Sequence, residues 1–251
     1  MKNSRPRPKI MSLGAMKNSR KMVVAPSVSV FHEVPQASKW AIELARSLAS
    51  TLPVGMPGLF NPWGDACALD RPWNDSAAKL SRLANHLDCV PKVILCGEAP
   101  GYAGARHSGV AFTSERQIVE GSVPRLTSAG QRLTARPNPF SELSATIVWE
   151  TLGRLGIAEQ TITWNAVQLH PHHLDNAHSN RTPRKTEVAL GVPAMKLLTE
   201  AFPSARIFAV GRTAEKLLLK MGFDVDVAIR HPANGGANLF RSGLTAAIAH
   251  L

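Results

Sequence analysis

Two loops and one strand end of the sequence hold residues whose types could do chemistry. The first loop, residues 97–115, begins with Gly97–Gly101 (GEAPG) directly after the apolar run KVILC. Its glycines and proline predict a tight turn that brings backbone N–H groups close to a ligand. Glu98 adds an ionisable group, and Tyr102 and Phe112 add aromatic rings. A turn without a ligand is the alternative, and a phosphate loop is excluded because no Gly-Lys-Ser/Thr follows.

The other two positions also follow predicted strands. Asn165 lies near the end of the run TITWNAV, and its amide offers a donor and an acceptor that suit an amide-like base edge. An asparagine that caps its own backbone is the alternative. His231 begins the glycine-rich loop RHPANGGANLFRSG after another apolar run, and a structural histidine is the alternative there. Gly235 and Gly236 allow the backbone to approach a ligand closely.

Together these segments resemble the uracil-DNA glycosylase superfamily over about residues 90–250. Gly97–Gly101 is similar to the GEAPG motif of one branch, and His231-Pro232 is similar to the second motif of the superfamily. Asn165 resembles its base-reading asparagine. Residues 180–187 (NRTPRKTE) are similar to the NRxP…E segment of the GEAPG branch, whereas residues 112–115 (FTSE) look more like a branch that has F-T-G-D.

The resemblance implies a monofunctional DNA glycosylase, a hydrolase of N-glycosyl bonds that flips uracil out of DNA and leaves an abasic site in base excision repair. Phe112 would stack on the flipped base, and Asn165 would pair with uracil and reject cytosine. The bond to the sugar breaks through an oxocarbenium-like state. Glu98, or as second candidate Glu115, would stabilise this cation and orient water. His231 and backbone N–H groups would stabilise the departing base.

The same comparison implies further contacts with substrate and strand. Tyr102 is a candidate for excluding the methyl group of thymine, and Leu239 or Phe240 for the wedge that the small, polar loop after His231 lacks. Arg106, Arg184, Lys185 and Arg241 would add local positive charge. The expected substrate-binding set is Gly97, Ala99, Pro100, Gly101, Tyr102, Phe112 and Asn165. The expected DNA-binding set is Asn180, Arg181, Arg230, Pro232, Asn234, Gly235, Leu239 and Phe240.

The sequence departs from some branches in its metal ligands. Iron–sulfur branches use four cysteines, whereas this chain has three, and the spacing of its histidines fits no zinc site. We therefore expect no cofactor and no metal. Another branch traps the abasic site through a histidine; Asn180 occupies that place here, and His178 lies two residues earlier. Covalent capture is thus an alternative to hydrolysis, as is a relative that binds uracil or abasic sites without cleaving. An unrelated α/β nucleotide-binding enzyme is the third possibility, against which the three segments together argue.

The elements that must position these residues follow from periodicity. Helices are predicted over 38–49, 75–87, 141–155, 185–201, 213–221 and 244–250, and strands over 92–96, 161–167, 206–210 and 225–229. Residues 51–75 and 168–184 read as loops. The alternation predicts an α/β fold: a single-domain three-layer αβα sandwich around a four-stranded, mainly parallel sheet. Ligands of such sheets bind at the carboxyl ends of the strands, where the three segments lie.

The net charge of the chain indicates which class of partner it could bind. The chain has 251 residues and a formal charge of +11, which favours a polyanionic partner. Residues 1–24 hold seven basic and no acidic residues, so the other 227 residues carry only +4. We expect 1–24 to be a basic, disordered tail, with a transit peptide as the alternative, and 25–251 to be the glycosylase-like domain. The expected partner is uracil-containing DNA, single- or double-stranded, bound by a cytoplasmic, nucleoid-associated monomer of bacterial type with no membrane contact.

Overall fold

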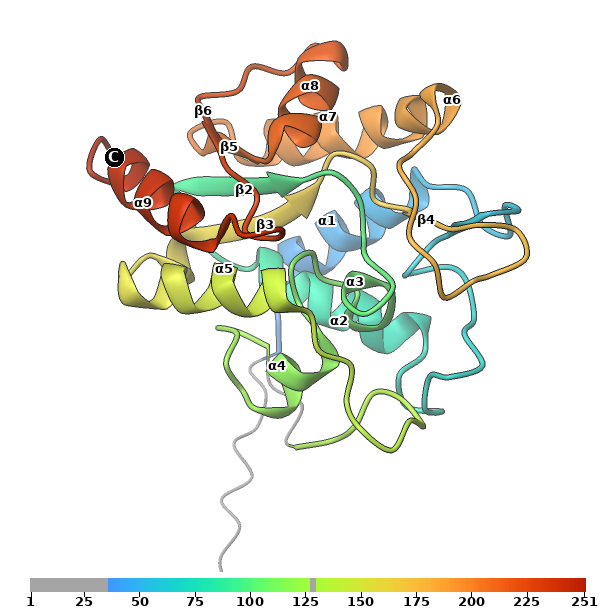
Figure 1. Ribbon diagram of the computed structural model, residues 1–251. Helices are drawn as coiled ribbons and strands as arrows, with labels where there is room; N and C mark the ends of the chain where they lie inside the picture. Colours follow the sequence, from blue (N-terminus) through green and yellow to red (C-terminus); the bar gives the residue numbers. More distant parts are fainter. Residues whose placement is uncertain (1–35, 127–129) are drawn as a thin grey trace, which may run out of the picture. The chain divides into compact units, whose positions relative to one another are not determined.

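The structure is a computed structural model that describes residues 36–126 and 130–251. Its centre is a four-stranded parallel sheet in the order β3-β2-β5-β6. The strands span Val93–Gly97 (β2), Thr161–Asn165 (β3), Arg206–Val210 (β5) and Val227–Ile229 (β6). Figure 1 shows helices on both faces of this sheet. The predicted α/β fold with a four-stranded parallel sheet is therefore confirmed, while the basic tail of residues 1–24 lies outside the described residues.

The two faces of the sheet are covered by different helices. Ile94 and Cys96 pack on one face with α1 (Lys39–Ser50), α2 (Ser76–Leu87), α7 (Val192–Ala201) and α8 (Arg212–Lys220). Val93 and Leu95 face the other way, toward α5 (Leu143–Arg154) and α9 (Ala237–Ile248). This alternation is the period of two of a β-strand that is buried on both faces. The sheet thereby holds the ends of its strands in a fixed position.

Several helix boundaries follow directly from local chemistry. Ser38 caps α1, and its hydroxyl oxygen accepts from the Ala41 N–H at 3.2 Å. Asp75 caps α2 in the same way, with 2.8 Å from the Ala78 N–H to its carboxylate. Gly156, with φ of 69°, follows the end of α5. These three boundaries lie within two residues of the predicted ones.

The predicted helix over 185–201 is divided in three. It consists of α6 (Lys185–Val188), a 3₁₀ turn (Ala189–Gly191) and α7, which begins next to Pro193. Proline has no N–H to donate and fits the first turn of a new helix. A Cβ atom on Gly191 would lie 2.2 Å from the Ala166 carbonyl oxygen, so the chain rests directly on the residue that follows β3.

The last helix begins seven residues before the predicted start. Asn234 and Gly235 adopt φ of 52° and 75°, which turns the chain sharply after His231. The helix α9 can therefore begin at Ala237, and the Phe240 N–H donates to the Gly236 carbonyl at 2.8 Å. The glycine-rich run was wrongly expected to remain a loop up to residue 243.

A two-stranded antiparallel sheet joins the two long predicted loops. Its strands, β1 (Leu59–Phe60) and β4 (His170–Pro171), pair Leu59 with Pro171 and Phe60 with His170. Two short helices, α3 (Ala105–Ser108) and α4 (Glu115–Val119), lie between β2 and α5. No helix within residues 36–126 and 130–251 is long and apolar enough to cross a membrane.

Candidate active site

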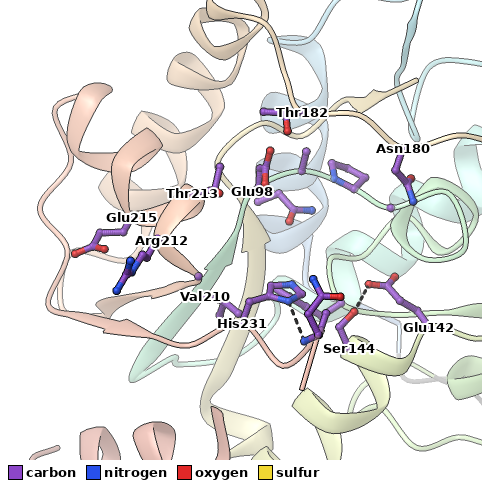
Figure 2. Close-up of a pocket in the computed structure, with 18 of the residues that line it drawn as sticks. Glu98, Glu142, Ser144, Asn180, Thr182, Val210, Arg212, Thr213, Glu215 and His231 are labelled. Carbon is purple, nitrogen blue, oxygen red and sulfur yellow. Dashed lines mark hydrogen bonds between the residues drawn. The ribbon is translucent and has the colours of Figure 1, made fainter. Parts of the chain in front are cut away.

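A cavity of about 1070 Å³ opens where the parallel strands end. The segments that follow β2, β3, β5 and β6 all contribute to its wall, together with the start of α5 and residues 180–182. In Figure 2, Glu98, Thr182 and Asn180 lie on one side of the cavity and His231, Ser144 and Glu142 on the other. The expected catalytic, substrate-binding and DNA-binding residues that line it are Glu98, Ala99, Pro100, Gly101, Phe112, Asn165, Asn180, Arg181, Arg230, His231 and Asn234.

The innermost wall is built from Phe112 and Asn165 beside Gly97. A Cβ atom on Gly97 would lie 2.7 Å from the Phe112 ring and 2.8 Å from Asn165 Oδ1, so glycine is required for these two side chains to converge. Asn165 is 7% exposed, and its carboxamide makes no described hydrogen bond within residues 36–126 and 130–251. An unpaired buried amide is costly unless a ligand pairs with it.

Phe112 has an unusual backbone conformation. Its φ is 50°, in the left-handed region that is unfavourable for a residue with a side chain. The indole N–H of Trp149, in α5, donates to the Phe112 carbonyl at 2.9 Å and holds the peptide in place. The ring is 7% exposed and borders the cavity. The fold thus fixes a flat aromatic surface next to the Asn165 amide.

Glu98 is half-buried and lines the cavity directly after β2. Loss of hydration raises the pKa of its carboxyl group, and a hydrogen bond with Thr182 opposes this shift. The Val167 N–H donates to the Glu98 carbonyl at 3.0 Å, which ties the residue to the end of β3. A carboxylate held in this way can accept a proton from water or face a developing positive charge.

His231 stands across the cavity in a defined tautomer. The Ala233 N–H donates to its Nδ1 at 3.1 Å, so Nδ1 carries no proton and we assign the proton to Nε2. Burial lowers the pKa of the ring, and neighbouring Arg230 lowers it further, so the imidazole is neutral at neutral pH. A Cβ atom on Gly236 would lie 2.0 Å from the His231 carbonyl oxygen, so glycine there lets the loop close around the histidine.

Glu115, the second candidate for the catalytic carboxylate, lies outside this cavity. It is 0% exposed, and Arg132, Leu133, Thr134 and Phe140 all donate hydrogen bonds to its carboxylate at 2.7–2.9 Å. Burial opposes its ionisation, but these hydrogen bonds outweigh burial and lower the pKa. Glu115 therefore joins residues 132–140 to α4, and its expected contact with the reacting sugar is contradicted by its position.

Several expected contacts with DNA are also corrected by burial. Phe240 is 0% exposed in the core between α9 and the sheet, whereas Leu239 is 61% exposed on the same helix. Arg106 is 5% exposed. Arg181 has both terminal nitrogens 2.7 Å from the Glu187 carboxylate, so its charge is balanced within the loop.

Tyr102 and His178 pack against each other instead of lining the cavity. Their ring centroids are 4.7 Å apart, and the rings are nearly parallel. Tyr102 also contacts Phe140 edge-on at 5.1 Å. Neither a contact of Tyr102 with a bound base nor an attack by His178 on a sugar is supported by this placement.

The structure adds residues that the sequence did not indicate. Glu142 lines the cavity at the start of α5, and the Ser144 hydroxyl donates to its Oε1 at 2.9 Å (Figure 2). Burial raises the pKa of Glu142, and the bond from Ser144 opposes the shift. A Cβ atom on Gly104 would overlap with Glu142 Oε2, so the glycine of the first loop makes room for this carboxylate. That clash depends on long-range packing, and no local sequence pattern signals it.

One group of possible metal ligands lies outside the cavity. Atoms of Cys67, Asp70 and His107 lie within 4.8 Å of one another. The Asp70 carboxylate already accepts from His107 Nδ1 at 2.7 Å and from Lys79 Nζ at 2.5 Å. Both oxygens of the Asp70 carboxylate are therefore already engaged, and the Lys79 pair links the loop to α2.

Comparison with known proteins agrees with this fold. The sequence profile of the uracil DNA glycosylase superfamily matches residues 84–247, and the chain belongs to this superfamily. No curated protein matches the chain. Among solved structures, SMUG2 of Pedobacter heparinus has a similar fold, with a TM-score of 0.57, 17% sequence identity, and coverage of 83% of this chain and 95% of that one. The matched residues include every strand of the central sheet.

Proposed function

We propose that this chain is a monofunctional glycosylase that removes uracil from DNA by hydrolysis. The single observation that carries the proposal is that Asn165, Phe112, Glu98 and His231 line one cavity at the strand ends. A planar base with amide-like edges fits between a flat ring and an unpaired carboxamide. The same cavity supplies a carboxylate and a neutral imidazole for breaking the glycosidic bond.

The residues suggest a sequence of events. A nucleotide leaves the stack and enters the cavity, where the Asn165 amide pairs with the edge of uracil and its N–H₂ group rejects the amino group of cytosine. As the N-glycosidic bond lengthens, positive charge develops on the sugar and negative charge on the base. The Glu98 carboxylate stabilises the cation and accepts a proton from the attacking water.

His231 acts on the departing base. Because its Nδ1 accepts from Ala233, the Nε2–H can donate a hydrogen bond to an oxygen of uracil that gains charge in the transition state. A neutral imidazole does this without surrendering its proton. The uracil anion then takes up a proton from solvent and Glu98 releases the proton that it accepted, so the products are free uracil and DNA with an abasic site.

Excision from labelled oligonucleotides tests this proposal. Single- and double-stranded substrates with one uracil are incubated with the full chain, and abasic sites are then cleaved with alkali. We expect product from at least one substrate and about a hundredfold lower rate for Glu98→Gln. Glu43→Gln, an exposed glutamate of α1, is the matched control and should retain the wild-type rate.

Two outcomes contradict the proposal in different ways. If neither substrate yields product, the chain is not a uracil glycosylase. If a protein–DNA band survives on a denaturing gel, the chain captures the abasic site covalently and the hydrolytic step is wrong. A Glu98→Gln variant with the wild-type rate would assign the carboxylate role to another group.

A further inference from the structure

A chain of hydrogen bonds leads from a buried arginine to the rim of the cavity. Arg106 Nη1 lies 2.9 Å from His170 Nδ1, and His170 Nε2 lies 3.0 Å from the Ser179 carbonyl and 3.1 Å from Asn180 Oδ1. Arg106 is 5% exposed and its guanidinium lies 3.7 Å from the centre of the Phe60 ring. His170 is 0% exposed and belongs to β4, which pairs with β1. The two-stranded sheet therefore fixes Arg106 and His170, the two inner members of this hydrogen-bond network.

The partners of His170 decide its proton position. Arginine only donates, so Nδ1 must accept, and the Ser179 carbonyl only accepts, so Nε2 must carry the proton. Both ends of the ring thus require the same neutral tautomer. Burial lowers the pKa of His170 to about 3, and the nearby Arg106 contributes to the shift. The ring remains in this state throughout the physiological pH range.

The same logic orients the side chain of Asn180. Its inward-facing atom is approached by the proton of His170 Nε2 and also by the Tyr102 backbone N–H at 2.8 Å. Two donors require an oxygen there, so the amide nitrogen faces away from them. Within residues 36–126 and 130–251, no described hydrogen bond engages that nitrogen, and Asn180 lines the cavity. The network thus presents an N–H₂ donor to the cavity.

The depth of Asn180 indicates what it would contact. Asn165 is 7% exposed at the inner wall, whereas Asn180 is exposed at the rim. A base that reaches Asn165 leaves its sugar and phosphates nearer to the rim. Phosphate oxygens accept hydrogen bonds, and amide side chains commonly donate to them.

We propose that Arg106 and His170 are positioning residues that hold the Asn180 amide with its N–H₂ group toward a phosphate oxygen of the flipped nucleotide's strand. This inference rests on the proposed function, because it assigns a contact of the same substrate. It explains why a histidine is buried between an arginine and an asparagine although neither of its ring nitrogens reaches the cavity.

A double-mutant cycle under steady-state conditions tests the coupling. Asn180→Ala should raise KM about tenfold with little change in kcat, because it removes one hydrogen bond to a part of the substrate that does not react. His170→Leu should raise KM by a similar factor. The double variant should also show about a tenfold rise instead of about a hundredfold, because His170 acts through Asn180. A purely structural His170 would give multiplied effects, which would overturn the proposal.

Three controls sharpen this experiment. His170→Gln retains one donor and one acceptor and should restore most of the affinity lost in His170→Leu. Asn138→Ala, an exposed asparagine outside the cavity wall, should leave KM unchanged. Substrates with one neutral methylphosphonate at successive linkages locate the acceptor. The penalty of Asn180→Ala should vanish at one linkage, and a penalty that persists at all of them would exclude a phosphate contact.

A second measurement remains informative if a variant does not fold or if the wild type excises nothing. The ¹⁵N shifts of the His170 ring in the full chain should show a proton on Nε2 and no titration between about pH 5 and pH 8. Titration in that range, or a proton on Nδ1, would overturn the positioning role. Without excision the proposed function fails, and the same cycle is then measured as Kd for an oligonucleotide with an abasic-site analogue.

Discussion

At the scale of single residues, the cavity combines groups whose protonation states are set by their surroundings. Glu98 is shifted toward its neutral form by burial, whereas His231 is kept neutral by burial and by Arg230. The two pKa shifts have the same main cause but opposite directions, because burial disfavours the charged form of either group. The carboxylate becomes the group that limits activity in acid, while the imidazole is ready to donate over a wide range of pH.

The rate of excision should therefore fall at acid pH, and we assign this acid limb of the pH–rate profile to Glu98. Because the pKa of Glu98 is raised, the group becomes protonated, and the rate falls, at a pH above the ordinary glutamate value of 4.5. The rate is measured by single-turnover excision across the acid range. The residual activity of Glu98→Gln should lack this limb. A limb that survives the substitution would belong to another group, with Glu142 the first to examine.

The His231 ring gives a second prediction at this scale. His231→Ala removes one donor to the departing base and should lower kcat about a hundredfold or more, with a smaller effect on KM. Steady-state kinetics on the uracil oligonucleotide measure both constants. A large rise in KM with unchanged kcat would show that the ring binds substrate without stabilising the transition state.

At the scale of elements, the buried Glu115 holds the loop that precedes α5 in place through hydrogen bonds. Its lowered pKa means that it stabilises the fold when ionised, above its unfolded pKa, and that this contribution is lost as the pH falls through the folded pKa. Glu115→Gln should lower the free energy of unfolding by about 2–4 kcal/mol at neutral pH. The difference should shrink on acidification. Urea denaturation at a series of pH values measures it, and a constant difference would contradict the assignment.

Helix α9 carries an exposed apolar side chain, Leu239, on its first turn after the His231 loop. We expect Leu239→Ala to lower excision from double-stranded DNA by roughly tenfold, since an apolar wedge helps to unstack a base. Excision from single strands should change little because no stack has to be opened. The ratio of the two rates is the measurement, and equal losses on both substrates would exclude the wedge.

Local sequence chemistry predicted most of the elements and several of the side chains that line the cavity. Ser38, Asp75 and Gly156 act within one turn of a helix, so their effects are visible in sequence. The division at Gly191 depends on a close backbone contact with the distant Ala166, whereas the early start of α9 depends on the left-handed turn at Asn234 and Gly235. Glu142 was missed because its place beside Gly104 also depends on packing between distant segments. Glu115 was misplaced because a carboxylate beside a motif has no visible sign of burial.

At the scale of the molecule, most of the net positive charge and the cavity lie in different parts of the sequence. Seven of the basic residues fall within residues 1–24, whereas the superfamily match covers residues 84–247. Several basic side chains outside residues 1–24, such as those of Arg106 and Arg181, make contacts within the protein. We therefore expect non-specific attraction to DNA and base removal to be separable.

Deletion of residues 1–24 should weaken non-specific DNA binding and reduce its salt dependence by up to about six in the slope of log K against log salt. Excision at saturating protein should remain close to that of the full chain. Fluorescence anisotropy in a salt series and single-turnover excision measure the two quantities. A folded truncated protein that no longer excises uracil would contradict the separation.

The tight turn between β6 and α9 also bears on how a lesion is found. Asn234 and Gly235 reverse the chain, and the buried Phe240 anchors α9 immediately afterwards. A short, anchored segment has little freedom to sweep along a groove, so we expect Leu239 to act on base pairs that the DNA has already begun to open. Spontaneous breathing would then govern capture, and uracil in mismatches, in bubbles and near strand ends would be repaired before uracil in stable helices.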